Sequence, residues 1–211
     1  MPGKYIVIEG PDGTGKTTQA QLLANKINDS GGSARYVHEP GETPMGLELE
    51  RTIKNRELSR SGLTDLLLFT ANRIELYNQV IKPEIDKGNH IIADRNWISS
   101  IVYQGFASGL DIETIRRVTT TMLPEHYSRP DATILLSLSS ERRRQLLGDR
   151  GTSDGDYFET KPDDFQRKLI EGYESIADDL QLVSESVSAS GTIDEVHAHI
   201  LSALDRTGII V

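Results

Sequence analysis

The 211-residue sequence predicts a three-layer α/β fold, with a five-stranded parallel sheet between helices on both faces. Two observations predict it. Short apolar runs alternate with amphipathic segments along the whole chain, as in repeated strand–helix–strand units. The first apolar run leads directly into a glycine-rich turn, and such sheets bind ligands at the carboxyl ends of their strands. We therefore expect one domain over residues 1–211, with one long polar segment at about 148–161.

Five short apolar runs have the length and composition of strands buried in a parallel sheet. The third, for example, reads His-Ile-Ile-Ala-Asp. Polar or glycine-containing segments follow the runs, and such segments end strands. The expected strands are Tyr5–Glu9, Ala34–His38, His90–Asp94, Thr133–Leu138 and Leu182–Val187.

Between the strands, apolar residues recur at the three- and four-residue spacing of a helix with one buried face. Gly31 and Gly88 lie where two of these helices should end, because glycine adopts a positive φ without strain. The expected helices are Lys16–Asn28, Leu63–Lys87, Ile112–Met122, Glu141–Leu147, Asp163–Leu182 and Ile193–Leu204.

Composition narrows the location and the partners of the protein. The chain has no cysteine, a formal net charge of −9 and no apolar run as long as a membrane span. Because general nucleic-acid binding needs a basic face, we expect no nucleic-acid partner. The first expected strand begins too early to leave room for a signal peptide. We expect a cytoplasmic protein, without a membrane partner, whose arginines gather at a site for anions.

Residues 10–17 read Gly-Pro-Asp-Gly-Thr-Gly-Lys-Thr, which matches the phosphate-binding loop G-x-x-x-x-G-K-[ST] between a strand and a helix. In this motif backbone N–H groups surround the phosphates, and the N-terminus of the next helix adds favourable partial charge. We expect Lys16 to reach the β- and γ-phosphates of a nucleotide and the Thr17 hydroxyl to bind Mg²⁺. The residues expected to bind this nucleotide, which the family resemblance described below implies to be ATP, are Gly10, Pro11, Asp12, Gly13, Thr14, Gly15, Lys16, Thr17 and Thr18.

A second polar cluster begins where the third expected strand ends, at Asp94-Arg95. A carboxylate at this edge of the sheet can hold Mg²⁺ through water, so Thr17 and Asp94 are the expected metal-binding residues. The guanidinium of Arg95 can bind a phosphate through two parallel hydrogen bonds. The polar side chains that follow in the same cluster are Ser99, Ser100, Tyr103 and Gln104.

Three smaller groups complete the candidate site. Glu39 follows the second expected strand in His-Glu-Pro-Gly, and Arg51 lies further along the chain. Phe69 and Arg73 are four residues apart and share one face of a helix, where a ring can stack on a base and a guanidinium can bind its edge. Arg150 lies in the long polar segment.

Together these segments resemble the thymidylate kinase family, whose members phosphorylate dTMP to dTDP with ATP. The resemblance runs through nearly the whole chain in the family's order, and it implies a P-loop kinase fold with a short lid at about 148–161. Its most specific part is residues 94–105 together with Phe69 and Arg73, because many families share the phosphate-binding loop. The matching segments are residues 5–18, 39–41, 68–73, 80–83, 94–105, 129–131, 187–189 and 193–196.

The resemblance implies in-line phosphoryl transfer, in which the arginines offset the repulsion between two anions. The Phe69 ring would stack on thymine, Arg73 would bind its O4, and Tyr103 would leave little space for a 2′-hydroxyl. The residues implied to bind the acceptor are Glu39, Arg51, Phe69, Arg73, Arg95, Ser99, Ser100, Tyr103 and Gln104. Those implied to be catalytic are Asp12, Lys16, Arg95 and Arg150, with Mg²⁺ as cofactor and ATP as donor.

The chain departs from its family at two places. One class of the family carries an arginine after the loop aspartate, where this chain has Gly13, and another class has several lid arginines. We expect Arg150 to be the lid arginine, with Arg143 as a weaker second candidate. Asn96 and Trp97 replace the commoner residues after Asp-Arg, which leaves a 5-modified deoxypyrimidine monophosphate open as the acceptor.

Three other functions remain open at this point. One is a regulatory protein that binds nucleotide without turnover, although the intact Lys16, Thr17 and Asp94 argue against it. A deoxynucleoside kinase would need a carboxylate as base near the 5′-hydroxyl, and Glu9 and Glu39 are candidates. A GTPase-type module would use Thr160-Lys161-Pro162-Asp163 to read guanine, but the polar segment before it argues for coincidence. The family resemblance also implies a homodimer formed by packing helices, for which Leu63–Lys87 is the candidate.

Overall fold

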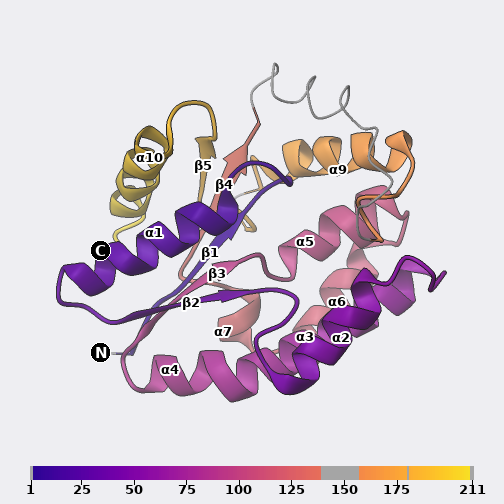
Figure 1. The fold of residues 1–211 in the computed structure, drawn as a ribbon, viewed down its shortest axis with the longest axis horizontal. Coiled ribbons are helices and arrows are strands. Elements are labelled where there is room, and N and C mark those ends of the chain that lie inside the picture. Colours follow the sequence, from indigo (N-terminus) through magenta and orange to yellow (C-terminus); the bar gives the residue numbers. More distant parts are fainter. Residues whose placement is uncertain (1, 139–156, 180, 210–211) are drawn as a thin grey trace.

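The computed structural model describes residues 2–138, 157–179 and 181–209, and its five strands form one parallel sheet in the order β2-β3-β1-β4-β5. The predicted fold class is therefore confirmed (Figure 1). The first three strands have the predicted bounds, whereas the last two are shifted or shorter. The strands are β1 Tyr5–Glu9, β2 Ala34–His38, β3 His90–Asp94, β4 Ala132–Ser137 and β5 Glu185–Ser188.

The central strand β1 is fully buried, and its alternate residues face two separate apolar clusters. Ile6 and Ile8 pack in the cluster that also contains residues of α1 (Lys16–Asp29) and α10 (Ile193–Arg206), the two helices on one side of the sheet (Figure 1). The fold thus has the three layers that alternating strands and amphipathic segments predict.

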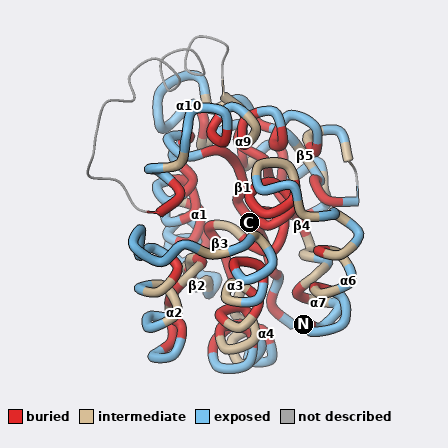
Figure 2. Tube along the Cα trace, turned by 90° about the vertical axis from the view of Figure 1, so that its right-hand side faces the viewer, coloured by how far each residue is buried: buried red, intermediate tan, exposed pale blue. Residues whose placement is uncertain are grey.

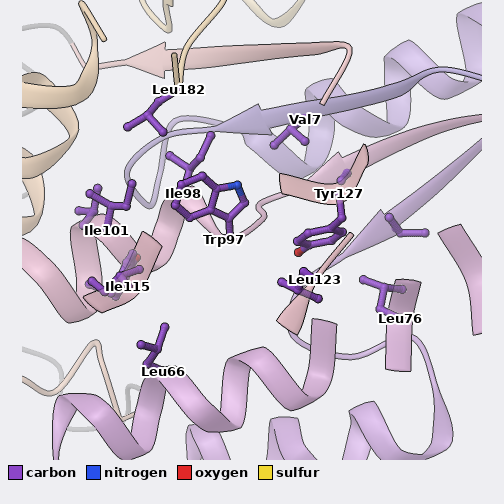
Figure 3. Packing of buried hydrophobic residues seen from close by; sticks show 14 of the residues in the cluster. Val7, Leu66, Leu76, Trp97, Ile98, Ile101, Ile115, Leu123, Tyr127 and Leu182 are labelled. Carbon is purple, nitrogen blue, oxygen red and sulfur yellow. The ribbon is translucent and has the colours of Figure 1, made fainter. Parts of the chain in front are cut away.

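Tyr5 and Val7 pack in the larger cluster on the opposite face of the sheet, which includes Trp97, Ile98 and Tyr127 (Figure 3). The middle strands are buried while the helices expose their outer faces (Figure 2). The helices that contribute to this cluster include α3 Gly62–Leu76, α6 Ile112–Met122, α7 Glu125–Ser128 and α9 Asp163–Ile176.

The predicted helix Leu63–Lys87 is interrupted. It consists of α3, a π-helical segment Tyr77–Ile81 and a short helix α4 (Lys82–Asp86). Pro83 explains the interruption, because proline has no N–H for the preceding turn and its ring displaces that turn.

Three helices of the structure have no counterpart among the predicted ones. α2 (Pro44–Lys54) is capped by Thr43, whose side chain accepts a hydrogen bond from the Gly46 N–H. α5 (Ile98–Ser100) continues into the π-helical segment Ile101–Ala107, and the third helix is α7. Most of 98–107 is buried, so it lacks the one-sided pattern that predicts a helix.

Two element boundaries near the end of the chain also differ from the prediction. α9 ends at Ile176 rather than Leu182, and β5 begins at Glu185. Gly31 and Gly88 have positive φ directly after helices, as predicted. The predicted helix Glu141–Leu147 lies outside the described residues. Within the described ranges, no helix is long and apolar enough to cross a membrane.

Candidate active site

The phosphate-binding loop closes around the ammonium group of Lys16. Gly15 has φ 83° and directly precedes the first residue of α1, and a Cβ on Gly10 would lie 2.5 Å from the Leu136 carbonyl oxygen. Lys16 Nζ donates a hydrogen bond to the Pro11 carbonyl at 2.9 Å and lies 3.5 Å from Asp12 Oδ1. The loop therefore places a cation at the centre of the turn, at the N-terminus of a helix.

The two charged side chains of the loop have perturbed pKa values. Burial and the nearby Arg95 guanidinium lower the pKa of Lys16 to about 8, against the opposing effect of Asp12, Asp94 and Glu9. Partial desolvation disfavours the ionised form of Asp12, whose side chain is 59% exposed, but Arg95, Lys16 and a hydrogen bond from Tyr103 together hold its pKa well below its usual range. Asp12 is therefore ionised at neutral pH, whereas a bound phosphate would stabilise the charged form of Lys16.

Thr17 and Asp94 form a pair of oxygen donors beside the loop. The Thr17 hydroxyl donates a hydrogen bond to Asp94 Oδ2 at 2.5 Å, and Asp94 Oδ1 is buried without a hydrogen-bond partner. Hydroxyl and carboxylate oxygens are the ligands that Mg²⁺ prefers, and Mg²⁺ usually keeps water and substrate phosphates as its other ligands. The pair fits such a site, although the described residues hold no cluster of three or more His, Asp or Glu side chains suited to a metal.

Arg95 links the loop to the rest of the site. It follows β3 with φ 77°, a left-handed conformation that is uncommon for a residue with a side chain. Its guanidinium donates hydrogen bonds to Tyr173 Oη at 2.6 Å and to the Gly10 carbonyl at 3.2 Å. It also forms an ion pair with Asp12 and donates to the Tyr103 hydroxyl at 3.3 Å.

Glu9 has a structural role that the sequence analysis did not predict. The side chain is fully buried at the end of β1, and Oε1 accepts hydrogen bonds from the backbone N–H groups of Asn96 and Ser99 at 3.0 and 3.1 Å. Oε2 accepts from Tyr173 Oη at 3.2 Å and from the Gly10 N–H at 3.3 Å. The available signal was a carboxylate inside a buried strand, which has to be hydrogen-bonded. Glu9 ties β1 to the start of α5.

A cavity of about 220 Å³ opens beside the loop on the side of Arg95. It brings together most of the residues predicted to bind the acceptor. It also contains residues that the sequence reasoning did not single out as acceptor-binding, among them Glu50, Lys54 and Phe158. The predicted residues that line it are Asp12, Glu39, Phe69, Arg73, Arg95, Ser99, Ser100, Tyr103 and Gln104.

Arg73 forms the inner end of this cavity with its guanidinium held on three sides. Nε donates to Glu39 Oε2 at 2.9 Å, Nη1 to Ser100 Oγ at 2.8 Å, and Nη2 to the Asn96 carbonyl at 3.0 Å. The Arg73 guanidinium carbon lies 5.4 Å from the centre of the Phe69 ring, so the predicted shared helix face is confirmed. A guanidinium has five N–H groups, and two remain for a ligand.

Gln104 provides the second polar group for a ligand. The residue is fully buried and lines the cavity, and neither its amide nitrogen nor its amide oxygen has a hydrogen-bond partner. An unpaired buried amide destabilises a protein, so its retention in a cavity indicates a ligand that both accepts and donates hydrogen bonds.

The cavity is also lined by Phe158, which is far in sequence from the predicted residues that line it. Its ring centre lies 6.0 Å from that of Phe69 and 5.4 Å from that of Tyr103, which it meets edge-on. The neighbouring Tyr157 stacks on the guanidinium of Arg60, with 3.9 Å between the guanidinium carbon and the ring centre. An aromatic pair in an otherwise polar segment was the signal that the sequence offered.

Among the residues predicted to bind the acceptor, Arg51 does not line the cavity in the described structure. The Arg51 side chain is 71% exposed on α2 and forms an ion pair with Glu48, one turn away. Arg150, like Arg143, lies outside the described residues. Thr160-Lys161-Pro162-Asp163, the guanine-like motif, begins in a turn and leads into α9, with the Lys161 ammonium over the Tyr157 ring at 3.9 Å.

The two carboxylates considered as bases for a nucleoside kinase are both engaged. Glu9 is saturated by backbone N–H and hydroxyl donors, and Glu39 forms a buried ion pair with Arg73 and accepts a hydrogen bond from Tyr127. A carboxylate that is already engaged in this way is a poor base for a 5′-hydroxyl, which disfavours that alternative.

The parallel sheet, the phosphate-binding loop and the adjoining cavity are typical of a P-loop kinase that acts on a small phosphorylated acceptor. A family model described as thymidylate kinase matches residues 8–200. The chain belongs to the thymidylate kinase family, as the sequence resemblance predicts.

Known proteins similar to this chain agree in name and length. Thymidylate kinases of Exiguobacterium sibiricum and Caldicellulosiruptor saccharolyticus are each 32% identical to it, and the alignments cover 98% and 97% of this chain and of the respective relative. A crystal structure of thymidylate kinase from Ehrlichia chaffeensis superposes with a TM-score of 0.76, with 24% identity, over 97% of this chain and all of that one. That structure supports the fold.

Proposed function

We propose that this protein transfers the γ-phosphoryl group of ATP to dTMP, with the phosphate-binding loop holding ATP and the adjoining cavity holding dTMP. The observation that carries the proposal is the pair Arg73 and Gln104 at the inner end of the cavity, with the Phe69 ring beside them. A pyrimidine stacked on this ring presents its edge to a cation donor and to a free amide.

The hydrogen-bond pattern favours thymine over cytosine. The two free N–H groups of Arg73 call for an acceptor, which thymine supplies at O4, whereas cytosine carries an amino group at that position. The Gln104 amide can accept from the thymine N3–H and donate to a carbonyl. Cytosine would place donor against donor at Arg73, which costs affinity.

Tyr103 supports the preference for deoxyribose. Its hydroxyl donates to Asp12 Oδ2 at 3.0 Å and accepts from Arg95, so the ring cannot readily withdraw from the cavity. A ring fixed in this way limits the space for a 2′-hydroxyl.

Catalysis by these residues consists of positioning and charge neutralisation. Arg95 lies between the loop and the cavity and would bind the acceptor phosphate, while Lys16 would bind the donor phosphates. Asp12 would orient both cations. Mg²⁺ would be held by Thr17 and Asp94, where it neutralises phosphate charge when bound.

Two arginines complete the proposal. Arg150 would act from the lid segment at about 148–161, and Arg51 would turn from Glu48 toward the acceptor phosphate. We propose one catalytic domain over residues 1–211 in the cytoplasm.

We also propose a homodimer formed through α2, α3 and α6. These helices and the loop between the first two carry six of the seven large apolar side chains that are at least 44% exposed in the described structure. Replacing one of them by a charge, Leu67→Glu, should yield monomers in sedimentation velocity, and an unchanged dimer would argue against this surface. The six residues are Met45, Leu47, Leu58, Leu63, Leu67 and Met122.

The activity is tested by measuring ADP release with ATP and Mg²⁺ against dTMP, dUMP, 5-hydroxymethyl-dUMP, dCMP, dGMP, UMP and thymidine. Turnover led by dTMP supports the proposal. Turnover led by another monophosphate would support the phosphoryl transfer but contradict the assignment of the cavity to thymine. Turnover of thymidine alone would overturn the proposal.

A further inference from the structure

The buried pair of Glu39 and Arg73 has a third member that no motif indicated. Tyr127, on the short helix α7, is fully buried, and its hydroxyl donates a short hydrogen bond to Glu39 Oε1. The other carboxylate oxygen accepts from Arg73 Nε at 2.9 Å. Side chains from α7, from the end of β2 and from α3 are therefore joined in one chain of hydrogen bonds that ends in the cavity.

We propose that Tyr127 is a positioning residue for base recognition, whose hydroxyl orients the Glu39 carboxylate and thereby aligns the Arg73 guanidinium with the edge of the base. This inference rests on the proposed contact between Arg73 and the base.

The position of the Tyr127 hydroxyl is fixed by packing that lies away from the cavity. The Tyr127 ring is stacked on Tyr5 of β1, with ring centres 5.6 Å apart and an interplanar angle of 28°. Tyr77 meets the same ring edge-on at 6.1 Å and 90°. Neither Tyr5 nor Tyr77 lines the cavity. The protein core therefore sets the place of this hydroxyl, and ligand binding does not need to order it.

The Arg73 guanidinium depends on Glu39 for its orientation more than on its other partners. Glu39 supplies the charged acceptor, while Ser100 and the Asn96 carbonyl are neutral. Hydrogen bonds that involve a charged group are stronger than neutral ones. A carboxylate with only one donor can rotate about its terminal bond, so loss of the Tyr127 hydroxyl would free Glu39 and, with it, the plane of Arg73.

The test replaces Tyr127 by phenylalanine, which keeps the ring and deletes the hydroxyl, and uses Y77F as the matched control because Tyr77 packs on the same ring. In Y127F we expect the KM for dTMP to rise about tenfold, with the KM for ATP and the kcat within about twofold. The preference for dTMP over dCMP should fall by a similar factor. Y77F should change neither quantity.

A purely structural role would lower the melting temperature of Y127F and leave the dTMP KM and the dTMP-to-dCMP preference unchanged, and that result would overturn the inference. A double-mutant cycle adds a second criterion. If Tyr127 acts through Glu39, the dTMP KM of Y127F/E39Q should equal that of E39Q alone. Additive effects of the two changes would overturn it.

R73K separates this inference from the proposal on which it rests. If R73K lowers the preference for dTMP over dCMP while Y127F does not, Arg73 reads the base and the inference about Tyr127 fails. If R73K leaves the preference unchanged, the base contact itself fails, and the inference fails with it. Loss of preference in both variants supports both.

Discussion

The two ion pairs of the site differ in their exposure to solvent. One lies at the base end, the part of the cavity around Arg73, and the other at the phosphate end, beside the phosphate-binding loop. At the base end, Arg73 and Glu39 have side chains that are each 2% exposed. At the phosphate end, Arg95 pairs with Asp12, whose side chain is 59% exposed. One ion pair is sealed inside the protein and the other opens to solvent.

This difference matches what each end has to bind. A neutral base brings no charge, so it is recognised by donors and acceptors in a fixed pattern, and a sealed pair keeps that pattern rigid. Phosphates bring charge and replace existing partners. Arg95 and Lys16 now bind Asp12 and carbonyl oxygens, and phosphate oxygens can take the place of these acceptors.

The largest effect is expected at the open end, from Arg95→Ala. Removing this guanidinium should lower kcat about 10³-fold, because arginines placed on transferred phosphates contribute on this scale. Steady-state kinetics with dTMP and ATP measures it. The control R167A removes a surface arginine that pairs with Asp164 and Glu171 and should leave kcat unchanged. A fall of less than tenfold in R95A would contradict the role.

The next effect concerns Lys16 and is a change of stability with pH. Its pKa is about 8 in the folded protein and about 10.4 when unfolded, so between these values the unfolded chain binds more protons and the unfolding free energy rises with pH. Charged Lys16 therefore destabilises the unliganded protein near pH 7, by up to about 3 kcal/mol. K16M should be more stable than the parent at pH 7, and the gap should close by pH 10.5 in urea unfolding.

K168M serves as the control, because the Lys168 side chain is 44% exposed. A constant gap for K16M would show that Lys16 is not destabilised by burial.

A smaller effect, of opposite sign for stability and binding, is expected for Gln104→Met. Removing the unpaired buried amide should raise the unfolding free energy of the unliganded protein by about 1 kcal/mol and weaken dTMP binding about 10- to 100-fold. Thermal unfolding and calorimetry measure the two changes, with Q79M on an exposed position as the control. A variant that loses stability would indicate that the amide has a structural partner.

The smallest effect is expected for Tyr173→Phe. Its hydroxyl bonds Arg95 and Glu9, but Arg95 keeps Asp12, Ser99 and a loop carbonyl as partners. We expect kcat to fall by less than about fivefold, well below the change in dTMP KM expected for Y127F. If the fall in kcat of Y173F exceeds the rise in dTMP KM of Y127F, the distinction between an exposed and a buried ion pair is wrong.

Much of the site followed from short-range patterns in the sequence. The phosphate-binding loop and the four-residue spacing of Phe69 and Arg73 fix local geometry, and the structure reproduces both. The strand ending at Asp94 was predicted to the residue, because an apolar run that stops at a carboxylate marks the edge of a buried strand.

Other parts could not be predicted because they depend on distant residues. The segment 98–107 is mostly buried, so the one-sided pattern of a surface helix is missing. Tyr127 and Glu39 are 88 residues apart, and nothing near either residue signals their contact. Arg51 shows the converse, since a residue that the resemblance implies to bind the acceptor lies outside the cavity and pairs with Glu48.

The sequence by itself determined the α/β class, the loop that holds phosphates and the family, because these depend on residue types at fixed short spacings. Only the tertiary structure decided which carboxylates are free and which are engaged, that Gln104 is buried without a partner, and that Tyr127 reaches the base end. The physical reason is that burial and hydrogen-bond partners are set by packing between segments far apart in the chain, and packing decides the energy of a charge or an amide.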